Sequence, residues 1–393
     1  MLRLPRRLAF FGFSIVVLLA STAGLVLAAS PNVSFDTSIV PPATTAFDIS
    51  FVKNDIGAYI LADRKNNAVD LFNAKNLSFT GGIGSGGFVG TGPSVCAVPH
   101  ACAGPNGDLI DNQNHVWAAD GPASDCGTNA ACRCFSGETT SMVKEYTLTV
   151  SSGATGRLAC LDTGGKFRAD EMAFDPRDDL LLVANDADGF LSLISTSGTP
   201  RIVDQFFYTD NDIGKAASRS GLSTPGGGIE QPVWNPQQGF FYLALPQGTS
   251  IGRVDVFNPK SGRLVFLRSL TVAGCDGGPS GLAINTSDEL LGACGSGAAL
   301  IDANSGKTSI LGSAATTGGA DEIWFDPGSN AWYLSTPGKL GVVSASPDHT
   351  VSAATHTGCC GHSVAAFTAS ASKSFIFDPN SAGTGISVFK AMP

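Results

Sequence analysis

The chain has 393 residues, of which 43% are hydrophobic and 15% are charged, and its formal net charge is −9. This size and apolar content allow a large buried core, and the acidic balance argues against nucleic acid as a partner. The 48 glycines and 21 prolines do not gather into low-complexity tracts, so they indicate a turn-rich ordered fold rather than disorder.

The N-terminal segment, residues 1–29, has the pattern of a signal peptide. Three arginines precede an apolar run at residues 8–19, and small residues near position 29 offer cleavage sites. Cleavage leaves one domain, residues 30–393, and predicts a secreted or periplasmic protein without membrane contact. An uncleaved N-terminal anchor is the alternative, because the apolar stretch reaches the roughly 20 residues that a spanning helix needs.

The ten cysteines fit an exported chain, because disulfides persist in oxidising compartments. Nearly all lie in loops between the repeats described below or in a long insertion at residues 121–137. We predict structural disulfides, whose connectivity the spacing does not give. The close pairs Cys132/Cys134 and Cys359/Cys360 could instead indicate redox or metal chemistry, but the absence of a Cys-x-x-Cys pair argues against a zinc ribbon.

From the end of the signal to the C-terminus, one phrase recurs at intervals of roughly 40 to 60 residues, which is the spacing of a repeat architecture. This repeated sequence motif consists of an acidic residue at its start, a short apolar run, an Asx/Pro/Gly turn and a second apolar run, as in residues 170–184 and 321–335. The copies begin at or near Phe47, Asn106, Asp170, Glu230, Ser280, Asp321 and Ser363.

Each repeat is typical of three short strands, A, B and C; in the first copy they cover residues 47–52, 58–62 and 68–72. No segment after the signal has sustained helical periodicity. We therefore predict an all-β protein, a β-propeller with seven blades of four-stranded antiparallel sheets. The last repeat supplies three strands at most, so residues 33–40 are expected to add the fourth and close the ring. Six blades is the alternative, if the first or the seventh repeat is not a blade.

In such a propeller the loops that enter strand A and those that leave strand B open onto one face, around the central channel. The residues at these positions are acidic: Asp48, Asp108, Asp170, Glu171, Glu230, Asp321 and Glu322 at strand A starts, and Asp63, Asp120, Asp186 and Asp378 at strand B ends. A ring of carboxylates is costly unless it binds a cation, pairs with bases or stays solvated. Turn-forming Asx residues with solvated side chains are the other interpretation.

One segment resembles a known family. Gly228-Ile-Glu230-Gln-Pro232-Val-Trp234, followed by Gly252-Arg-Val254, resembles the first blade of the regucalcin/gluconolactonase propellers, and Gly104-Pro105-Asn106-Gly107 resembles their Pro-Asn-Gly motif. The blade pattern is also similar to strictosidine-synthase-like and NHL-type propellers. The order of the two motifs is reversed here, and the family usually has six blades, so the resemblance is specific at two short motifs only.

The resemblance implies a metal site made of Glu230 and Asn106, with Asp170 as a third ligand or general base and Asp321 as the other candidate for that role. Oxygen ligands of this kind suit Ca²⁺, Mg²⁺ or Mn²⁺, and Zn²⁺ is possible. The implied activity is hydrolysis of a lactone or a similar small ester at the channel, where the metal polarises the carbonyl and activates water.

The alternative function is a non-catalytic secreted propeller that binds a protein, a glycan or a small ligand at the channel face, and whether the chain is an enzyme stays open at this point. We expect a monomer. His100 and His362, which both precede a strand A, could bind a softer metal or act as acid and base, or else lie in surface loops.

Overall fold

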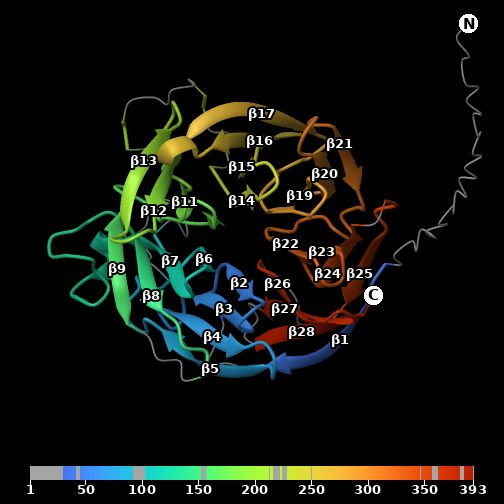
Figure 1. Ribbon diagram of the computed structural model, residues 1–393, viewed down its shortest axis with the longest axis horizontal. Coiled ribbons are helices and arrows are strands. Elements are labelled where there is room, and N and C mark those ends of the chain that lie inside the picture. The colour runs from blue at the N-terminus through green and yellow to red at the C-terminus, as the bar shows by residue number, and fades with distance from the viewer. Residues whose placement is uncertain are drawn as a thin grey trace, which may run out of the picture.

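The computed structural model describes residues 30–40, 45–91, 102–151, 156–211, 213–215, 222–223, 228–248, 250–345, 347–355, 362–380 and 385–392. In this part of the chain the strands form seven four-stranded antiparallel sheets. Figure 1 shows them arranged as the blades of a ring around a central axis. The prediction of an all-β propeller with seven blades is therefore confirmed.

The first strand of each blade is innermost, and the following strands lie successively further out. Blade 1 contains β2 (Ser50–Lys53), β3 (Ala58–Asp63), β4 (Ala68–Asn73) and β5 (Ser78–Ile83). Blade 2 contains β6 (Asp108–Ile110), β7 (His115–Pro122), β8 (Ser141–Thr147) and β9 (Arg157–Asp162). Blade 3 contains β10 (Met172–Asp175), β11 (Leu180–Asn185), β12 (Phe190–Ser195) and β13 (Arg201–Phe207).

Blades 4 to 6 repeat this order. Blade 4 contains β14 (Pro232–Asn235), β15 (Phe240–Leu245), β16 (Ile251–Asn258) and β17 (Val265–Ala273). Blade 5 contains β18 (Leu282–Ile284), β19 (Glu289–Cys294), β20 (Gly297–Asp302) and β21 (Thr308–Leu311). Blade 6 contains β22 (Ile323–Asp326), β23 (Ala331–Thr336), β24 (Lys339–Ser344) and β25 (Val351–Thr355).

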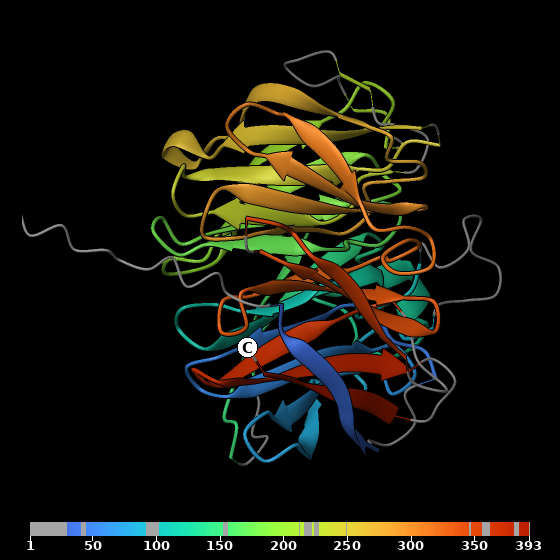
Figure 2. The ribbon, with the colours of Figure 1, turned by 90° about the vertical axis from the view of Figure 1, so that its right-hand side faces the viewer.

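Blade 7 is built from both ends of the described chain. Its inner strands are β26 (Ala365–Ser370), β27 (Lys373–Asn380) and β28 (Gly385–Met392), and its outermost strand is β1 (Asn32–Ile39). β1 pairs antiparallel with β28 from Asn32↔Met392 to Ile39↔Ile386. In Figure 2 the blue β1 accordingly crosses the red strands of blade 7. The prediction that the segment at 33–40 closes the ring is thus confirmed.

In the repeat, an Asp or Asn stands at the end of strand A, and its side chain shapes the turn to strand B. The side chains of Asp175, Asn235 and Asn285 each accept a hydrogen bond from the backbone N–H two residues later, at 2.9, 2.9 and 2.8 Å. Such an Asx turn reverses the chain within a few residues. In the blade 4 turn, Gly239 has φ 74°, a left-handed conformation that glycine adopts without a steric cost.

The apolar runs pack between neighbouring blades. Tyr59 and Phe72 of blade 1 have ring centroids 5.3 Å apart, and the Tyr59 ring stacks at 4.4 Å on Phe377 of blade 7. All three rings are fully buried. Because a blade buries its two faces only against its neighbours, closing the ring removes from water the apolar surface that a single blade would expose.

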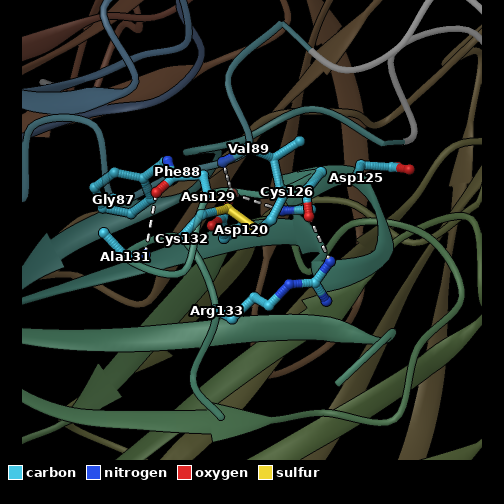
Figure 3. Close-up of a disulfide and its surroundings, with 12 residues drawn as sticks. Gly87, Phe88, Val89, Asp120, Asp125, Cys126, Asn129, Ala131, Cys132 and Arg133 are labelled. Atoms are coloured by element: carbon cyan, nitrogen blue, oxygen red, sulfur yellow. Dashed lines mark hydrogen bonds between the residues drawn. A yellow bond between two sulfur atoms is a disulfide. The ribbon is translucent and has the colours of Figure 1, made fainter. Parts of the chain in front are cut away.

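The long connection between β7 and β8, which contains the short 3₁₀ helix η1 (Ala123–Cys126), is the predicted cysteine-rich insertion. Two disulfides, Cys126–Cys132 and Cys134–Cys160, tie it to itself and to β9. Figure 3 shows Cys126–Cys132 lying beside Asp120, Phe88 and Val89. A third disulfide, Cys275–Cys294, joins the chain ahead of blade 5 to the end of β19.

The prediction of structural disulfides is confirmed for these three pairs, which favour an oxidising compartment over the cytosol. Cys96, Cys359, Cys360, His100 and the predicted signal segment 1–29 lie outside the described residues. In the part of the chain that is described, no helix is both long enough and apolar enough to cross a bilayer.

Replacing both Cys275 and Cys294 by alanine is expected to lower the free energy of unfolding by about 3 kcal/mol, because the lost cross-link closes a loop with a sequence separation of 19. The matched replacement of Cys126 and Cys132, whose separation is 6, is expected to cost about 2 kcal/mol. Guanidinium unfolding without reductant measures both. An effect of the 275–294 change below about 1 kcal/mol would contradict the assignment of this disulfide as a stabilising cross-link.

Candidate functional site at the channel mouth

The residue two positions before each strand A occupies an equivalent place in every blade. The backbone N–H of Asp48, Asp170 and Glu230 donates to the carbonyl of Ala62, Ala184 and Ala244, respectively, on the neighbouring strand B. Asn106 and Ser280 make the same hydrogen bond in blades 2 and 5. We call these positions the mouth ring: Asp48, Asn106, Asp170, Glu230, Ser280, Asp321 and Ser363.

All four residues predicted as ligands or catalytic groups, Asn106, Asp170, Glu230 and Asp321, therefore belong to one ring at one end of the channel. They come from blades 2, 3, 4 and 6. Their side chains, however, have different partners, and these partners decide what each one can do.

Arg64 occupies the part of the mouth between blades 1 and 2. It forms a buried ion pair with Asp48 and donates from Nε and a terminal nitrogen to Oδ1 of Asn106, at 3.1 and 2.8 Å. The Asn106 amide nitrogen donates to the carbonyls of Ala103 and Ala169, at 2.9 and 2.7 Å. The hydrogen-bonding capacity of Asn106 is thus used by the protein, and its oxygen faces a guanidinium.

Arg168 occupies the adjacent part of the mouth, at blade 3. Its guanidinium contacts Oδ2 of Asp170 at 2.6 Å and lies 3.6 Å from Oδ2 of Asp186. Burial raises the pKa of Asp170 and Arg168 partly offsets this, so the pKa of Asp170 is about 6. Burial and the neighbouring Asp170 raise the pKa of Asp186 to about 7.

His362 bridges two carboxylates of the mouth ring. Its Nε2 lies 2.6 Å from Oδ1 of Asp48, and its Nδ1 lies 2.6 Å from Oδ2 of Asp321. Burial lowers the pKa of His362, but Asp321 and Asp48 outweigh burial and hold it well above its usual range. An imidazolium that donates from both nitrogens to carboxylates is an electrostatic clamp between blades 1, 6 and 7, rather than a free base.

The two carboxylates that hold His362 stay ionised. Burial raises the pKa of Asp48 and of Asp321, but Arg64 and His362 at Asp48, and His362 at Asp321, bring both pKa values below the ordinary range. Neither group is therefore poised to exchange protons near neutral pH.

One residue further along the chain, three side chains meet across the channel. Nε2 of Gln231 donates to Oε2 of Glu322 at 3.1 Å, while Oε1 of Gln231 accepts from the N–H of Leu282 at 2.6 Å. The carboxyl groups of Glu171 and Glu322 interact with each other. We call Glu171, Gln231 and Glu322 the inner layer, because each directly follows a residue of the mouth ring in the chain.

The inner layer holds buried carboxyl oxygens that the protein does not satisfy. Oε2 of Glu171 and Oε1 of Glu322 have no hydrogen-bond partner among the described residues, and both side chains are at least 95% buried. Burial raises the pKa of Glu322 to about 8, and burial with the charges of Glu322 and Glu230 raises that of Glu171 well above its usual range. Both carboxyl groups therefore hold a proton more readily than an exposed glutamate does.

Glu230 lies on the side of the mouth that has the fewest cations. Burial raises its pKa well above the usual range, and Asp186, Asp321 and Asp170 raise it further, with Arg168 as the counteracting charge. The acidic groups at this end of the channel outnumber the bases: the acids are Asp48, Asp170, Glu171, Asp186, Glu230, Asp321 and Glu322, and the bases are Arg64, Arg168 and His362.

One three-residue group with metal-ligand geometry occurs among the described residues, and it lies elsewhere. Ligand atoms of Asp111, His115 and Glu145 in blade 2 are within 4.8 Å of one another. His115 Nδ1 lies 2.8 Å from Glu145 Oε1, while Asp111 accepts hydrogen bonds from two backbone N–H groups of its own turn and from the indole of Trp117. The A–B turn of blade 2 thus holds Asp111, and Glu145 of β8 pairs with His115.

Two buried arginines of the mouth, Arg64 and Arg168, were not predicted from the sequence. Arg64 directly follows Asp63, the last residue of strand B in blade 1. Arg168 stands two residues before Asp170, the mouth-ring residue of blade 3. A basic residue close to an acidic position of the repeat was the available signal, but the exposed Lys65 next to Arg64 satisfies it equally well and lies outside the mouth contacts.

Comparisons with known proteins agree with this architecture. No protein-family model matches the chain, and no curated protein matches it significantly. Solved structures are similar: hydrazine synthase of Kuenenia stuttgartiensis has a TM-score of 0.60 at 12% identity, with 90% of this chain and 97% of that chain covered. Virginiamycin B lyase of Staphylococcus aureus and Sqt1 of Saccharomyces cerevisiae each have a TM-score of 0.57 at 12% identity, with 92% and 100% covered.

At these identities the likeness shows the fold alone. The protein belongs to the class of seven-bladed β-propellers, closed by an N-terminal strand and carrying a polar mouth at one end of the channel. Its similarity to the regucalcin/gluconolactonase propellers consists of the two short motifs around Asn106 and Glu230.

Proposed function

We propose that the channel mouth binds a divalent cation through Glu230 and Asp170, and that the bound cation serves a hydrolase acting on a lactone or a similar small ester. The main support is the excess of carboxyl groups over bases, together with the partnerless buried oxygens of Glu171 and Glu322. Buried carboxylates without compensation are expensive, and a divalent cation offsets several of them at once.

The donor set of this side of the mouth fits a hard cation. Carboxylate oxygens suit Ca²⁺, Mg²⁺ or Mn²⁺. The proposed ligands keep Glu230 and Asp170 from the sequence prediction and leave out Asn106, because Arg64 binds its oxygen and places a positive charge beside it. We assign Asn106 to the positioning of Arg64.

A bound cation would polarise a substrate carbonyl and acidify a water molecule. Among the protein groups, Asp186 is the best suited to accept a proton from that water, because its pKa of about 7 matches neutral conditions. Asp321, the other candidate base from the sequence, is tied to His362 with a lowered pKa and fits the role less well. Arg64 and Arg168 could orient a polar substrate group.

Glu230→Gln is expected to weaken Ca²⁺ or Mn²⁺ binding at least about tenfold, since one charged ligand is lost. Protein dialysed against EDTA and titrated calorimetrically gives the affinity, and a panel of lactones and aryl esters gives the activity. The matched control is Glu145→Gln, which should leave the affinity unchanged. Loss of binding in the control but not in Glu230→Gln would place the cation at Asp111, His115 and Glu145 instead.

The second candidate function is a non-catalytic propeller that binds a small molecule, a protein or a glycan at this face. It is favoured by one observation: Asp48, Asp170 and Asp321 are each paired with a cationic side chain of the protein itself. If the wild-type protein binds no divalent cation, this function replaces the hydrolase.

A further inference from the structure

At the end of the channel where the A–B turns lie, the strands A enclose a cavity of about 480 Å³. Strands A of blades 1 to 6 line it, and its lining extends from Gln231 of the inner layer to residues of the A–B turns such as Asn112 and Pro236. This volume lies within the range of small-molecule sites, about 300–1,000 Å³. Neither the proposed cation nor the mouth ring makes use of it.

The wall of the cavity is aromatic and apolar. Phe51 of blade 1 and Trp324 of blade 6 meet edge to face with ring centroids 5.3 Å apart, and Phe174, Met172 and Val233 continue the wall. These side chains are only partly buried: they pack against the cores between blades and also line the cavity. Such a wall fits an apolar or aromatic body and offers cation–π contacts.

One buried carboxyl group interrupts this wall. Asp108, at the start of β6, lines the cavity, is 97% buried, and has no hydrogen-bond partner at either carboxyl oxygen among the described residues. Burial raises its pKa well above the usual range, and the charges of Asp48 and Glu322 raise it further. The other charged lining residues are engaged: Lys53 donates to the carbonyl of Asp111 at 2.9 Å, and the Asp111 carboxylate accepts from Trp117.

We propose that this cavity binds a small organic ammonium ion, whose charged group pairs with Asp108 while its apolar or aromatic body packs against Phe51, Phe174 and Trp324. A buried carboxylate is stabilised by a charged donor far more than by a neutral one. A neutral ligand would leave Asp108 without its ionic partner, and an anion would add to the negative potential from Glu322 and Asp48. The ligand class follows from this combination of an apolar wall and one unmatched acid.

The first test uses the wild-type protein with three probes of equal size and different charge: 2-phenylethylammonium, 2-phenylethanol and phenylacetate. Titration followed by calorimetry or by tryptophan fluorescence is expected to give an affinity for the ammonium probe at least about tenfold above those of the other two. Equal affinities for the charged and the neutral probe, or no binding of the ammonium probe, would overturn the proposal.

The second test locates the site. Asp108→Asn keeps the shape of the side chain but cannot ionise to pair with an ammonium group, and it is expected to reduce the affinity for 2-phenylethylammonium about tenfold while leaving the weak affinity for 2-phenylethanol unchanged. Asp178→Asn, an exposed acid on the neighbouring blade, is the matched control and should have no effect. An unchanged affinity in Asp108→Asn places the ammonium elsewhere and refutes the assignment.

This proposal can be separated from the divalent cation at the mouth. The ammonium titrations are carried out in EDTA and are repeated with Glu230→Gln, which should bind the probe as the wild type does. A probe that binds only when a divalent cation is present would contradict a site independent of the mouth. Failure of cation binding in the earlier experiment leaves the expected result for the ammonium probe unchanged.

Discussion

Lys144→Ala is expected to lower the free energy of unfolding by about 3–5 kcal/mol, because it leaves the carboxylate of Asp120 buried without its partner. Nζ of Lys144 lies 2.5 Å from Oδ2 of Asp120, and both side chains are fully buried. The same ammonium group donates to the carbonyls of Gly87 and Cys132, at 2.7 and 2.6 Å. One side chain therefore links β8, the end of β7 and the disulfide-bonded insertion.

The control for this prediction is the double change Lys144→Met with Asp120→Asn. It removes both charges, keeps the acceptor oxygen for the N–H groups of Val89 and Gly121, and should be more stable than Lys144→Ala alone. Lys65→Met, at an exposed position, should change stability by less than about 0.5 kcal/mol. Guanidinium unfolding without reductant measures all three; a Lys144→Ala protein as stable as Lys65→Met would refute the role given to the ion pair.

In EDTA, the free energy of unfolding is expected to fall as the pH rises from about 5 to about 8. Asp170, Asp186 and Glu322 have native pKa values of about 6, 7 and 8, above their ordinary values of 3.8, 3.8 and 4.5. The native protein thus binds more protons than the unfolded chain in this range, so each such group contributes stability that is lost as the pH passes its native pKa. The slope is about 1.4 kcal/mol per pH unit for each proton of difference.

His362 acts in the same direction, because its pKa is also raised: its contribution is fully present below its unfolded pKa of 6.5 and is lost only as the pH rises through the native value. Asp48 and Asp321, whose pKa values are lowered, contribute stability that is lost only on acidification below about pH 4. These two groups therefore do not reverse the trend between pH 5 and 8.

Thermal or denaturant unfolding across this pH range tests the prediction, and two additions sharpen it. Glu322→Gln should make the decline less steep, since one titrating group is removed. Saturating Ca²⁺ should stabilise the protein more at pH 8 than at pH 5, because the cation competes with protons for the same carboxyl groups. A stability that is constant or rises from pH 5 to 8 in EDTA would show that the mouth carboxyl groups are already neutralised in another way.

The fold could be predicted because the repeat encodes it locally. The Asx turns at Asp175, Asn235 and Asn285 use residues whose own side chains satisfy the turn, and the apolar runs before and after them define strands A and B. The closing strand could be predicted because the last repeat lacks a fourth strand and the segment at 33–40 has no other partner. In the first blade the predicted strands at 47–52, 58–62 and 68–72 agree with β2, β3 and β4 to within a few residues.

The partners of the site could be predicted only in part. That Asn106, Asp170, Glu230 and Asp321 share one ring follows from the repeat alone. That Arg64 reaches Asn106, 42 positions along the chain, depends on how two blades lie beside each other, and no local pattern encodes this. The same holds for His362, which contacts both Asp48 and Asp321. Asp48 is 314 residues away from it in the sequence. The repeat therefore determines where these residues lie, whereas contacts between residues distant in the sequence determine their charge and their partners.

The pairing of β1 with β28 has a consequence for how the protein folds and fails. An open array of repeats can fray one unit at a time from either end, and its terminal units need polar caps. Here β1 and β28, from the two ends of the described chain, share one sheet, so blade 7 cannot form before its last strand is available. In the closed ring every blade also lies between two others, and none is terminal. Such long-range pairing is slow to form, and it couples the two ends of the described chain: losing β1 would leave the outer edge of β28 unpaired and remove the contact of β1 with β25 of blade 6.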